Sequence, residues 1–501
     1  MTDSGMASDA LAIARLAALP GIEYDRCRES EASRLGIRVA TLDAEVAAAR
    51  RAVGRHDEDE ADRPPEYSDE SIALKFTERH AGQLRYVSAW GRWLRYDGAR
   101  WAPDETLAVF DLARGICRTA AAECNDQRTA PRIAAAQTVT AVERLARADR
   151  RHAATADQWD ADPWLLNTPG GVVDLRTGNA RPHAPTDHMT KITAAAPGGD
   201  CPLWRRFLDR ITGGDADLCA FLQRMAGYSL TGITREHAMV FCYGTGSNGK
   251  GVFLNTLTAI WGDYAATATM ETFTASPTDR HPTDLAMLRG ARLVTAQETE
   301  EGRRWAEARI KAMTGGDPIT ARFMRQDFFT FVPTFKLLIA GNHKPALRGV
   351  DEAIRRRLHL IPFGVTIPAA ERDKELPGKL KAEWGGILAW AIEGCLDWQR
   401  DGLTPPPAVA SATDEYLAGE DSLGLWVTEC CTTSGYGNEA GARLFSSWRT
   451  WAEAAGEQAG SQRRFTQALL ARGFEQTRLH GGTRGFQGIY LRAEQPFGEG
   501  R

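Results

Sequence analysis

Residues 237–254 read HAMVFCYGTGSNGKGVFL, and this stretch decides the fold of the middle of the chain. A short apolar run enters a glycine-rich loop, and an apolar helical pattern follows. Glycines at 244, 246 and 249 let backbone N–H groups converge on phosphate oxygens, and Lys250 can reach the β and γ phosphates. Strand, loop and helix occur in the order that a phosphate-binding loop requires. The stretch therefore predicts a nucleotide-binding α/β domain.

The whole loop is expected to bind ATP. Its residues are Gly244, Thr245, Gly246, Ser247, Asn248, Gly249, Lys250, Gly251 and Val252. Position 251 departs from the usual pattern, because glycine has no hydroxyl to offer Mg²⁺. We therefore expect the metal to be held by the nucleotide, water, acidic groups from elsewhere or a nearby hydroxyl such as Thr256.

A second apolar stretch, RLVTAQ at 292–297, runs directly into Glu298 and Glu300. A strand that delivers carboxylates beside a phosphate site has the Walker B arrangement. Glu298 is the candidate for polarising the attacking water or holding hydrated Mg²⁺, and Glu300 is the second candidate. The alternative is a solvated acidic helix start, which suits Glu301 better than Glu298.

A third apolar stretch, FKLLIAG at 335–341, ends in Asn342. We expect this strand between the loop strand and the Walker B strand. An uncharged amide there can hydrogen-bond to water or to the γ-phosphate without neutralising it, so Asn342 suits a sensor role.

Three consecutive arginines, 355–357, precede another apolar strand. A guanidinium that reaches the γ-phosphate of a neighbouring subunit would stabilise transition-state charge. Any of the three arginines is a candidate for this role. The alternative is ion pairing with Asp351 and Glu352, and at least one arginine should be of that kind because adjacent side chains diverge.

Taken in order, GTGSNGKG, LVTAQETEEG, IKAMTGGDPITARF, FKLLIAGNHKP and RRRLHLIPF resemble the superfamily 3 helicase core of phage and plasmid primase-helicases, a family that includes poxvirus-type replicative helicases. The likeness covers roughly residues 70 to 490. It implies a modified AAA+ domain that forms a hexameric ring, hydrolyses ATP between subunits and moves along single-stranded DNA, usually 3′ to 5′. In that family the positions of Lys250, Glu298, Asn342, Arg356 and Arg357 belong to the ATP site. This sequence has Arg355 where a Trp is usual, and Gly251 where Ser is common.

The stretch between the second and third strands predicts a β-hairpin. Residues 319–323 and 328–331 alternate as strands, and 324–327 form the tip. In a ring, Lys311, Arg322 and Arg325 could contact DNA phosphates, with Phe323 as a stacking surface. For most of these aromatic residues, packing within the hairpin is the better interpretation.

Residues 421–492 show helices followed by a hairpin, the pattern of a winged helix. From residue 440 to 492 there are eight Arg and three acidic residues, so the locally basic surface lies here. Arg463 and Arg464 begin the expected recognition helix and are predicted to bind DNA. A winged helix used for protein contacts is the alternative.

Composition limits the remaining classes. The 501 residues carry 61 Lys and Arg against 65 Asp and Glu, which excludes a uniformly basic nucleic-acid coat. Nine Cys show no C-x-x-C pair and no zinc quartet. Long apolar runs and a basic leader are missing, so we expect no membrane contact and a cytoplasmic location in a bacterial host.

The predicted architecture is α/β: a P-loop AAA+ core between an N-terminal α/β domain and a C-terminal winged helix. Seven segments are expected: a helical segment 1–56, an acidic linker 57–70, an α/β domain 71–200, a helical collar 201–235, an AAA+ domain 236–395, a linker 396–420 and a winged helix 421–492. Only about 70 residues precede the shared region, too few for a primase domain.

These features predict an ATP-dependent replicative DNA helicase of a phage, prophage or plasmid-like element. It would act on single-stranded and forked DNA as a homo-hexamer, with ATP and Mg²⁺ as cofactors and a separate primase or initiator protein as partner. The alternative is an AAA+ origin-binding initiator that uses ATP as an assembly switch and hardly unwinds DNA. A scaffold without hydrolysis would follow if Gly251 disables the metal site.

Overall fold

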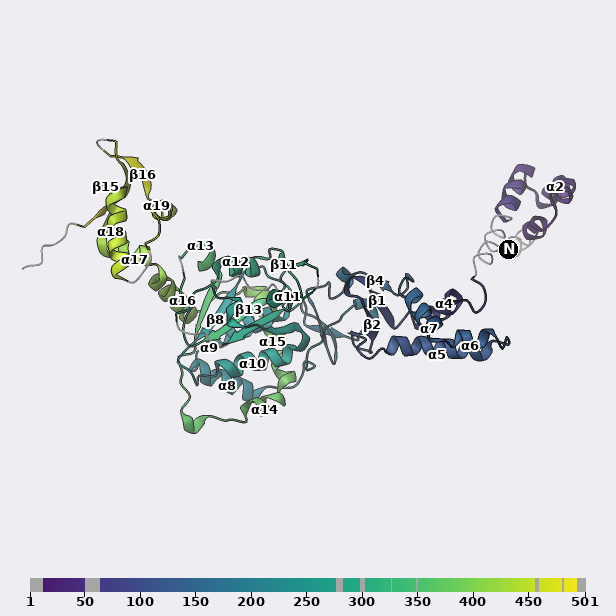
Figure 1. Cartoon of the computed structure of the whole chain (residues 1–501), viewed down its shortest axis with the longest axis horizontal. Coiled ribbons are helices and arrows are strands. Elements are labelled where there is room, and N and C mark those ends of the chain that lie inside the picture. The colour runs from purple at the N-terminus through teal and green to yellow at the C-terminus, as the bar shows by residue number, and fades with distance from the viewer. Residues whose placement is uncertain are drawn as a thin grey trace, which may run out of the picture. The chain divides into compact units, whose positions relative to one another are not determined.

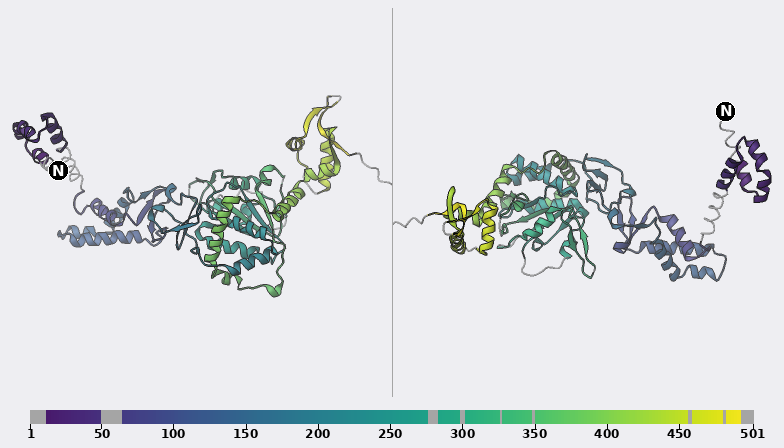
Figure 2. Two further views of the ribbon diagram at one scale, coloured as in Figure 1. Left: turned by 180° about the vertical axis from the view of Figure 1, so that it is seen from behind. Right: turned by 90° about the horizontal axis from the view of Figure 1, so that it is seen from above.

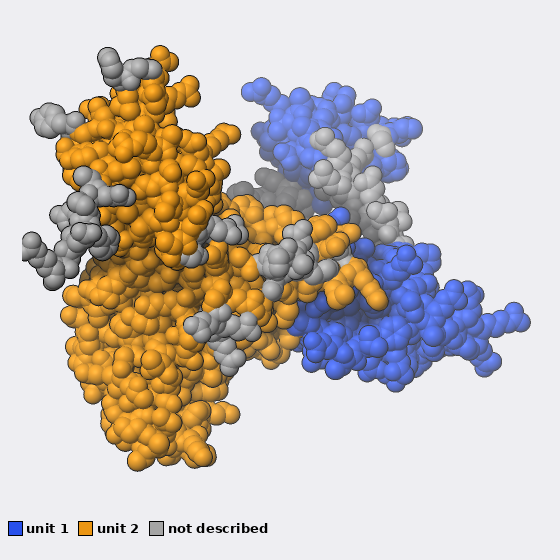
Figure 3. Space-filling view, turned by 60° about the vertical axis from the view of Figure 1, so that its left-hand side comes forward, with its two compact units in different colours: residues 1–95, 103–156 blue, residues 96–102, 157–501 orange. Residues whose placement is uncertain are grey.

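The computed structural model describes residues 12–49, 64–275, 283–297, 302–325, 327–347, 350–455, 459–479 and 482–492. The chain divides into two compact units, which Figure 3 colours separately: Met1–Arg95 with Pro103–Ala156, and Tyr96–Ala102 with Asp157–Arg501. The expected 71–200 domain is therefore wrong at its C-terminal boundary. Residues 157–200 belong to the second unit because their apolar side chains, including Leu166, Val173 and Leu175, enter its core.

Residues 12–49, the described part of the predicted helical segment 1–56, are helical, and the rest of that segment lies outside the described residues. Helix α2 (Gly21–Leu35) lies between helical residues 12–17 and 39–49. Gly36 ends α2 with φ 67°, a left-handed conformation that glycine adopts without strain. The helices share a small core of Leu16, Tyr24, Ala32, Leu42 and Val46.

The acidic segment 57–70 is only partly described, since residues 57–63 lie outside the described residues. Its last two residues are not linker, because they form the first turn of α4 (Asp69–His80). The side chain of Ser68 accepts a hydrogen bond from the N–H of Ser71, which caps this helix.

Helices and a small sheet form the rest of the first unit. The helices are α4, α5 (Ala108–Glu123), α6 (Thr129–Ile133) and α7 (Ala136–Ala146). Strand β1 (Leu84–Val87) pairs antiparallel with β2 (Arg92–Tyr96) and parallel with β4 (Ala153–Ala154). Their shared core contains Ile72, Phe76, Leu84, Trp93, Val109 and Val142.

A parallel five-stranded sheet is the centre of the second unit (Figure 1). Its order is β14-β8-β13-β10-β9. The strands are β8 (Met239–Tyr243), β9 (Ala265–Thr267), β10 (Leu293–Gln297), β13 (Lys336–Gly341) and β14 (Leu358–Pro362). All adjacent pairs are parallel. The expected position of the third apolar strand, between the other two, is confirmed by the registers of β13 with β8 and β10.

Helices cover both faces of this sheet, as Figure 2 shows. Alternate residues of β8 enter different cores. Val240 and Cys242 pack in one core, whereas Met239 and Phe241 pack in the core on the other face. The helices of the first core are α8 (Pro202–Thr212), α9 (Ala216–Leu230), α10 (Lys250–Trp261) and α15 (Trp384–Asp401). Burial on both faces explains why the strand reads as a continuous apolar run rather than an alternating one.

Helices α9 and α15 approach each other closely. A Cβ atom at Gly227 would lie 2.0 Å from the backbone nitrogen of Cys395, and one at Gly394 would lie 2.2 Å from the carbonyl oxygen of Gln223. Only glycine permits this contact. The helices of the predicted collar, 201–235, are therefore packed against the sheet domain through α15. A short helix, α14 (Leu376–Lys381), precedes α15.

Residues 396–420 are not a linker. Helix α15 continues to Asp401, and α16 (Pro407–Glu420) follows after a short connection. Tyr416 and Leu417 of α16 are buried in the second core of the sheet domain, and the hydroxyl of Thr413 accepts a hydrogen bond from the N–H of Leu360 in β14. The triple proline that suggested a linker instead supplies the first residue of this helix, where a missing N–H costs nothing.

Two further three-stranded sheets belong to the second unit. Strands β5 (Leu165–Thr168), β6 (Gly171–Asp174) and β7 (Asn179–Arg181) form an antiparallel meander. The C-terminal segment contains α17 (Ser422–Cys430), β15 (Cys431–Ala440), α18 (Gly441–Ala454), α19 (Gln462–Ala471), β16 (Glu475–Arg478) and β17 (Arg484–Leu491). Its sheet has the order β15-β17-β16, and its own core includes Trp426, Leu444, Phe465 and Ile489.

Candidate nucleotide-binding site

The loop 244–249 connects β8 to α10, as the sequence predicts. A Cβ atom at Gly244 would lie 2.4 Å from the carbonyl oxygen of Phe363, so only glycine fits beside the end of β14. Asn248 donates from Nδ2 to the same carbonyl at 3.0 Å. Gly249 has φ 85°, which places the first turn of α10 directly after the loop. These contacts fix the loop between two parallel strands.

The ammonium group of Lys250 is buried, and none of the described residues gives it a carboxylate partner. The residue is 7% exposed, and its Nζ donates to the carbonyl oxygen of Gly244 at 2.7 Å, to Asn248 Oδ1 at 3.1 Å and to Asn342 Oδ1 at 3.3 Å. Among the described residues no carboxylate lies within ion-pairing distance of it. Burial lowers the pKa of Lys250 from its usual value. An anion beside this nitrogen would compensate for the cost of burying the charge.

Other loop residues differ in exposure. Thr245 and Ser247 are exposed, and the carbonyl oxygen of Ser247 accepts a hydrogen bond from the N–H of Ile367 at 2.8 Å. Val252 is half-buried against the first core of the sheet domain. One side of the loop is thus anchored by Val252 against the core, and its other side is polar and accessible at Thr245 and Ser247.

Asn342 lies at the end of the middle strand, as predicted, and its side chain contacts Lys250. It directly follows β13, in which Gly341 is level with Tyr243 of β8. Two residues that are 92 positions apart in the sequence are therefore brought within hydrogen-bonding distance by parallel pairing.

The candidate carboxylates Glu298 and Glu300 lie outside the described residues. Strand β10, which precedes them, ends at Gln297, the residue level with Ala340 of β13. Their roles in water activation and metal binding stay predictions.

The three arginines have different environments. Arg357 is 8% exposed, and it donates from Nη1 to the carbonyl oxygen of Ala353 at 2.7 Å and from Nε to Thr314 Oγ1 at 3.2 Å. Arg355 lies 3.4 Å from Asp414 of α16. Arg356 is exposed, and its guanidinium has no hydrogen-bond or ion-pair partner among the residues that the structure describes. Of Arg356 and Arg357, only Arg356 presents a guanidinium that is accessible to another molecule.

The predicted hairpin is present. Strands β11 (Ile319–Ala321) and β12 (Phe329–Phe331) pair antiparallel, with Ile319 opposite Phe331. Arg325 is exposed in the connection and has φ 60°. Arg322 is half-buried and lies 4.6 Å from the ring of Phe328, whereas Phe323 stacks on Phe329.

Lys311 is not on the hairpin. It belongs to α12 (Glu307–Gly315), and it forms an ion pair with Asp351, the residue that caps α13 (Glu352–Arg355). Arg463 and Arg464 both lie exposed in the first turn of α19. These positions agree with the expected secondary structure, and their contact with DNA stays a prediction.

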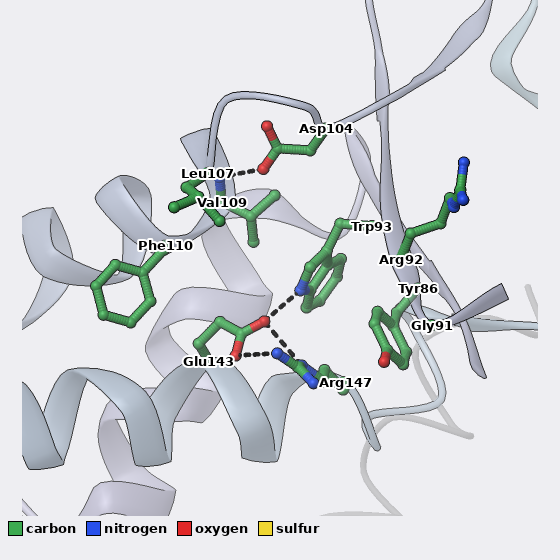
Figure 4. A pocket seen from close by; sticks show the side chains of 10 residues that line it. All are labelled: Tyr86, Gly91, Arg92, Trp93, Asp104, Leu107, Val109, Phe110, Glu143 and Arg147. Atoms are coloured by element: carbon green, nitrogen blue, oxygen red, sulfur yellow. Dashed lines mark hydrogen bonds and ion pairs between the residues drawn. The ribbon is translucent and has the colours of Figure 1, made fainter. Parts of the chain in front are cut away.

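The first unit contains a pocket, which Figure 4 shows from close by. Its polar groups bind one another. Glu143 is buried and accepts hydrogen bonds from Trp93 Nε1 at 2.5 Å and from both Nε and Nη2 of Arg147 at 2.8 and 2.7 Å, while Arg147 also lies over the ring of Tyr86. The carboxylate of Glu143 is thus already paired with its neighbours within the pocket.

Sequence reasoning missed one polar contact at the nucleotide site. The Nε2 of Gln297 donates to Oδ1 of Asn255 at 2.6 Å, which joins the end of β10 to α10. The sequence places Gln297 at the predicted strand end and Asn255 in the predicted helix. Their spacing along the chain did not indicate that the two amides are in contact.

Two known families match this chain. Residues 73–213 match the family described as "D5 N terminal like", and residues 242–357 match a "Family of unknown function (DUF5906)". The chain has a primase-helicase-like architecture. The second match begins in β8 and ends at Arg357, so it contains the loop, strands β10 and β13 and the arginine cluster.

Similar proteins occur in two viruses. The primase-helicase-like chain is 26% identical over 257 residues to "Putative helicase 022R" of Frog virus 3 (isolate Goorha), and 25% identical over 283 residues to "Putative helicase L207/L206" of Acanthamoeba polyphaga mimivirus. These matches include 47% and 51% of this chain. The chain covers only 26% and 29% of the length of these two relatives.

Among solved structures, the apo form of the NrS-1 C terminal region is similar to this chain. The likeness covers 84% of this chain and 100% of that one, at 10% sequence identity and a TM-score of 0.47. In the part of the primase-helicase-like chain that the structure describes, no helix has the length and apolar character needed to cross a membrane.

Proposed function

We propose that this chain is an ATP-dependent DNA helicase subunit with a P-loop AAA+ core. One observation carries the proposal: the buried ammonium of Lys250 is held by three neutral oxygens at the end of a glycine loop, without a carboxylate partner among the described residues. A triphosphate would supply the missing negative charge and a high-energy phosphoanhydride bond. The names of the two viral relatives support DNA unwinding as the use of that energy.

Each site residue then has a chemical role. Lys250 binds the β and γ phosphates, and the loop N–H groups and the start of α10 bind the remaining oxygens. Asn342 orients water or the γ-phosphate from the adjacent strand, and Glu298 polarises that water with Glu300 nearby. Arg356 completes the site of a neighbouring subunit, which requires a ring, and we propose a homo-hexamer.

DNA contacts come from two basic regions. The hairpin presents Arg325, with Arg322 and Lys311 behind it, and the C-terminal segment presents Arg463 and Arg464 at the start of α19. We propose that this C-terminal segment is a winged helix that binds duplex DNA, and that primer synthesis is supplied by a separate primase or initiator protein.

ATPase and strand-displacement assays test the function. Wild-type protein should hydrolyse ATP faster with single-stranded DNA and should displace a strand from a forked duplex. Lys250→Ala should abolish both activities, whereas Lys374→Ala, which changes an exposed lysine in the same unit, should leave both intact. Full activity of Lys250→Ala would reject the site. Stimulated hydrolysis without strand displacement would favour the origin-binding initiator instead.

A further inference from the structure

A serine at position 251 would carry a hydroxyl, which Gly251 lacks. The space for that hydroxyl lies next to a side-chain oxygen from another element. A Cβ atom at Gly251 would lie 3.5 Å from Gln297 Oε1, which is ordinary van der Waals contact. Gly251 is the second residue of α10 and directly follows Lys250, the residue expected to reach the phosphates. An amide oxygen therefore lies beside the position from which a serine hydroxyl would project.

A second amide fixes the direction of this oxygen. Gln297 Nε2 donates to Asn255 Oδ1 at 2.6 Å. The other atom of the Gln297 amide, Oε1, therefore faces Gly251. Positions 251 and 255 are four residues apart and lie on the same face of α10. The side chain of Gln297 thus lies along this face, with its nitrogen at one turn and its oxygen at the preceding turn.

Thr256, the hydroxyl suggested for the metal, fits less well, and the candidate carboxylate Glu298 lies outside the described residues. Thr256 is six residues beyond Lys250, about 9 Å along the helix axis, and is only 6% exposed. Within the described ranges, no group of three or more His, Cys, Asp or Glu side chains could hold a metal ion. Amide oxygens are suitable ligands for Mg²⁺, which binds oxygen and retains several waters.

We propose that Gln297 Oε1 replaces the hydroxyl missing at position 251 as the protein ligand of the Mg²⁺ that accompanies the nucleotide. The exchange keeps the ligand neutral, so the charge of the site is the same as with serine. Asn255 acts as a positioning residue that orients the amide. The inference rests on the proposed nucleotide site, but it makes a separate claim about which atom binds the metal.

Metal binding can be measured without turnover. The probe is Mn²⁺, detected by electron paramagnetic resonance in the presence of ADP, and nucleotide binding is measured separately in EDTA with a fluorescent ADP analogue. Gln297→Leu should weaken Mn²⁺ binding by roughly tenfold. Binding of the analogue in EDTA should change by less than about twofold, since Lys250 and the loop are untouched. Gln137→Leu, on the exposed face of α7, is the matched control.

Restoration distinguishes a ligand from a structural residue. The double variant Gln297→Leu with Gly251→Ser should recover Mn²⁺ binding, because the hydroxyl would then come from α10 itself. Gln297→Glu should retain Mn²⁺ binding, because an oxygen remains at the same reach. Unchanged Mn²⁺ binding in Gln297→Leu, or no recovery with serine at 251, would overturn the inference while leaving the nucleotide site in place. Failure of wild-type protein to bind the analogue would overturn both.

Discussion

Two adjacent arginines should respond in opposite ways to the same substitution. Arg357 is buried and hydrogen-bonded to Ala353 and Thr314, whereas the guanidinium of Arg356 is exposed. Arg357→Ala should therefore affect folding. Arg356→Ala should affect only a reaction that involves a second subunit.

The structure sets the size of each effect. Arg357→Ala removes two hydrogen bonds and leaves the carbonyl oxygen of Ala353 without this donor, and each such loss costs about 1 to 3 kcal/mol. We expect the free energy of unfolding of the second unit to fall by about 2 to 4 kcal/mol. Arg356→Ala should change that free energy by less than about 0.5 kcal/mol. Loss of an arginine finger should reduce the ATPase rate by about 10³-fold or more.

Urea denaturation and a subunit-mixing assay measure the two effects. Inactive Arg356→Ala and inactive Lys250→Ala proteins should regain ATPase activity when mixed. Some interfaces then combine an intact loop from one subunit with an intact Arg356 from its neighbour. The reasoning would be refuted if Arg357→Ala unfolded like wild type, or if mixing restored no activity although both variants formed rings.

Three other predictions test separate parts of the molecule. Burial lowers the pKa of His359 to about 4, so the unfolded chain takes up this proton first as the pH falls. The stabilisation from neutral His359 is complete above pH 6.5 and is lost as the pH falls towards 4. In urea denaturation, the free energy of unfolding should be about 2 kcal/mol lower at pH 5 than at pH 7. His359→Phe should make this difference smaller. Glu143→Leu removes the acceptor of Trp93 Nε1 and should cost the first unit about 2 kcal/mol in thermal unfolding, whereas Glu143→Gln should cost less because an oxygen remains. Arg325→Ala should weaken single-stranded DNA binding and reduce the salt dependence of log K by about 0.7, as measured by fluorescence anisotropy, and an unchanged slope would exclude a phosphate contact.

Local chemistry made the centre of the fold predictable. Glycines that permit close approach and positive φ, followed by Lys250, indicate a loop between a strand and a helix, and the structure has that loop. The order of the apolar runs also indicated which strands are neighbours, because parallel strands place their carboxyl ends at one edge. The amide of Asn342 accordingly lies within hydrogen-bonding distance of Lys250, a contact that the sequence did not predict.

Tertiary packing decided what the sequence left open. No local signal separates Arg356 from Arg357, since their environments depend on Ala353 and on Thr314 in α12. The triple proline suggested a linker, but the apolar face of α16 finds a partner in β14. The contact of Gln297 with Asn255 joins positions 42 residues apart, and it depends on how β10 lies against α10.

Lys250 and Lys336 are both buried in the sheet domain. Their surroundings differ, and the difference explains why we expect Lys250 to bind an anion. Lys336 begins β13, and its ammonium group donates to the carbonyl oxygens of Thr231, Ile233 and Thr334, while burial lowers its pKa well below the usual value. Backbone carbonyls cannot leave without unfolding their segments, so Lys336 is fixed as part of the core. Lys250 lies near the opposite end of the same strand, and two of its three acceptors are side-chain amides. Amides can rotate aside when phosphate oxygens arrive, so we expect the same residue type to serve structure at one end of the strand and phosphate binding at the other.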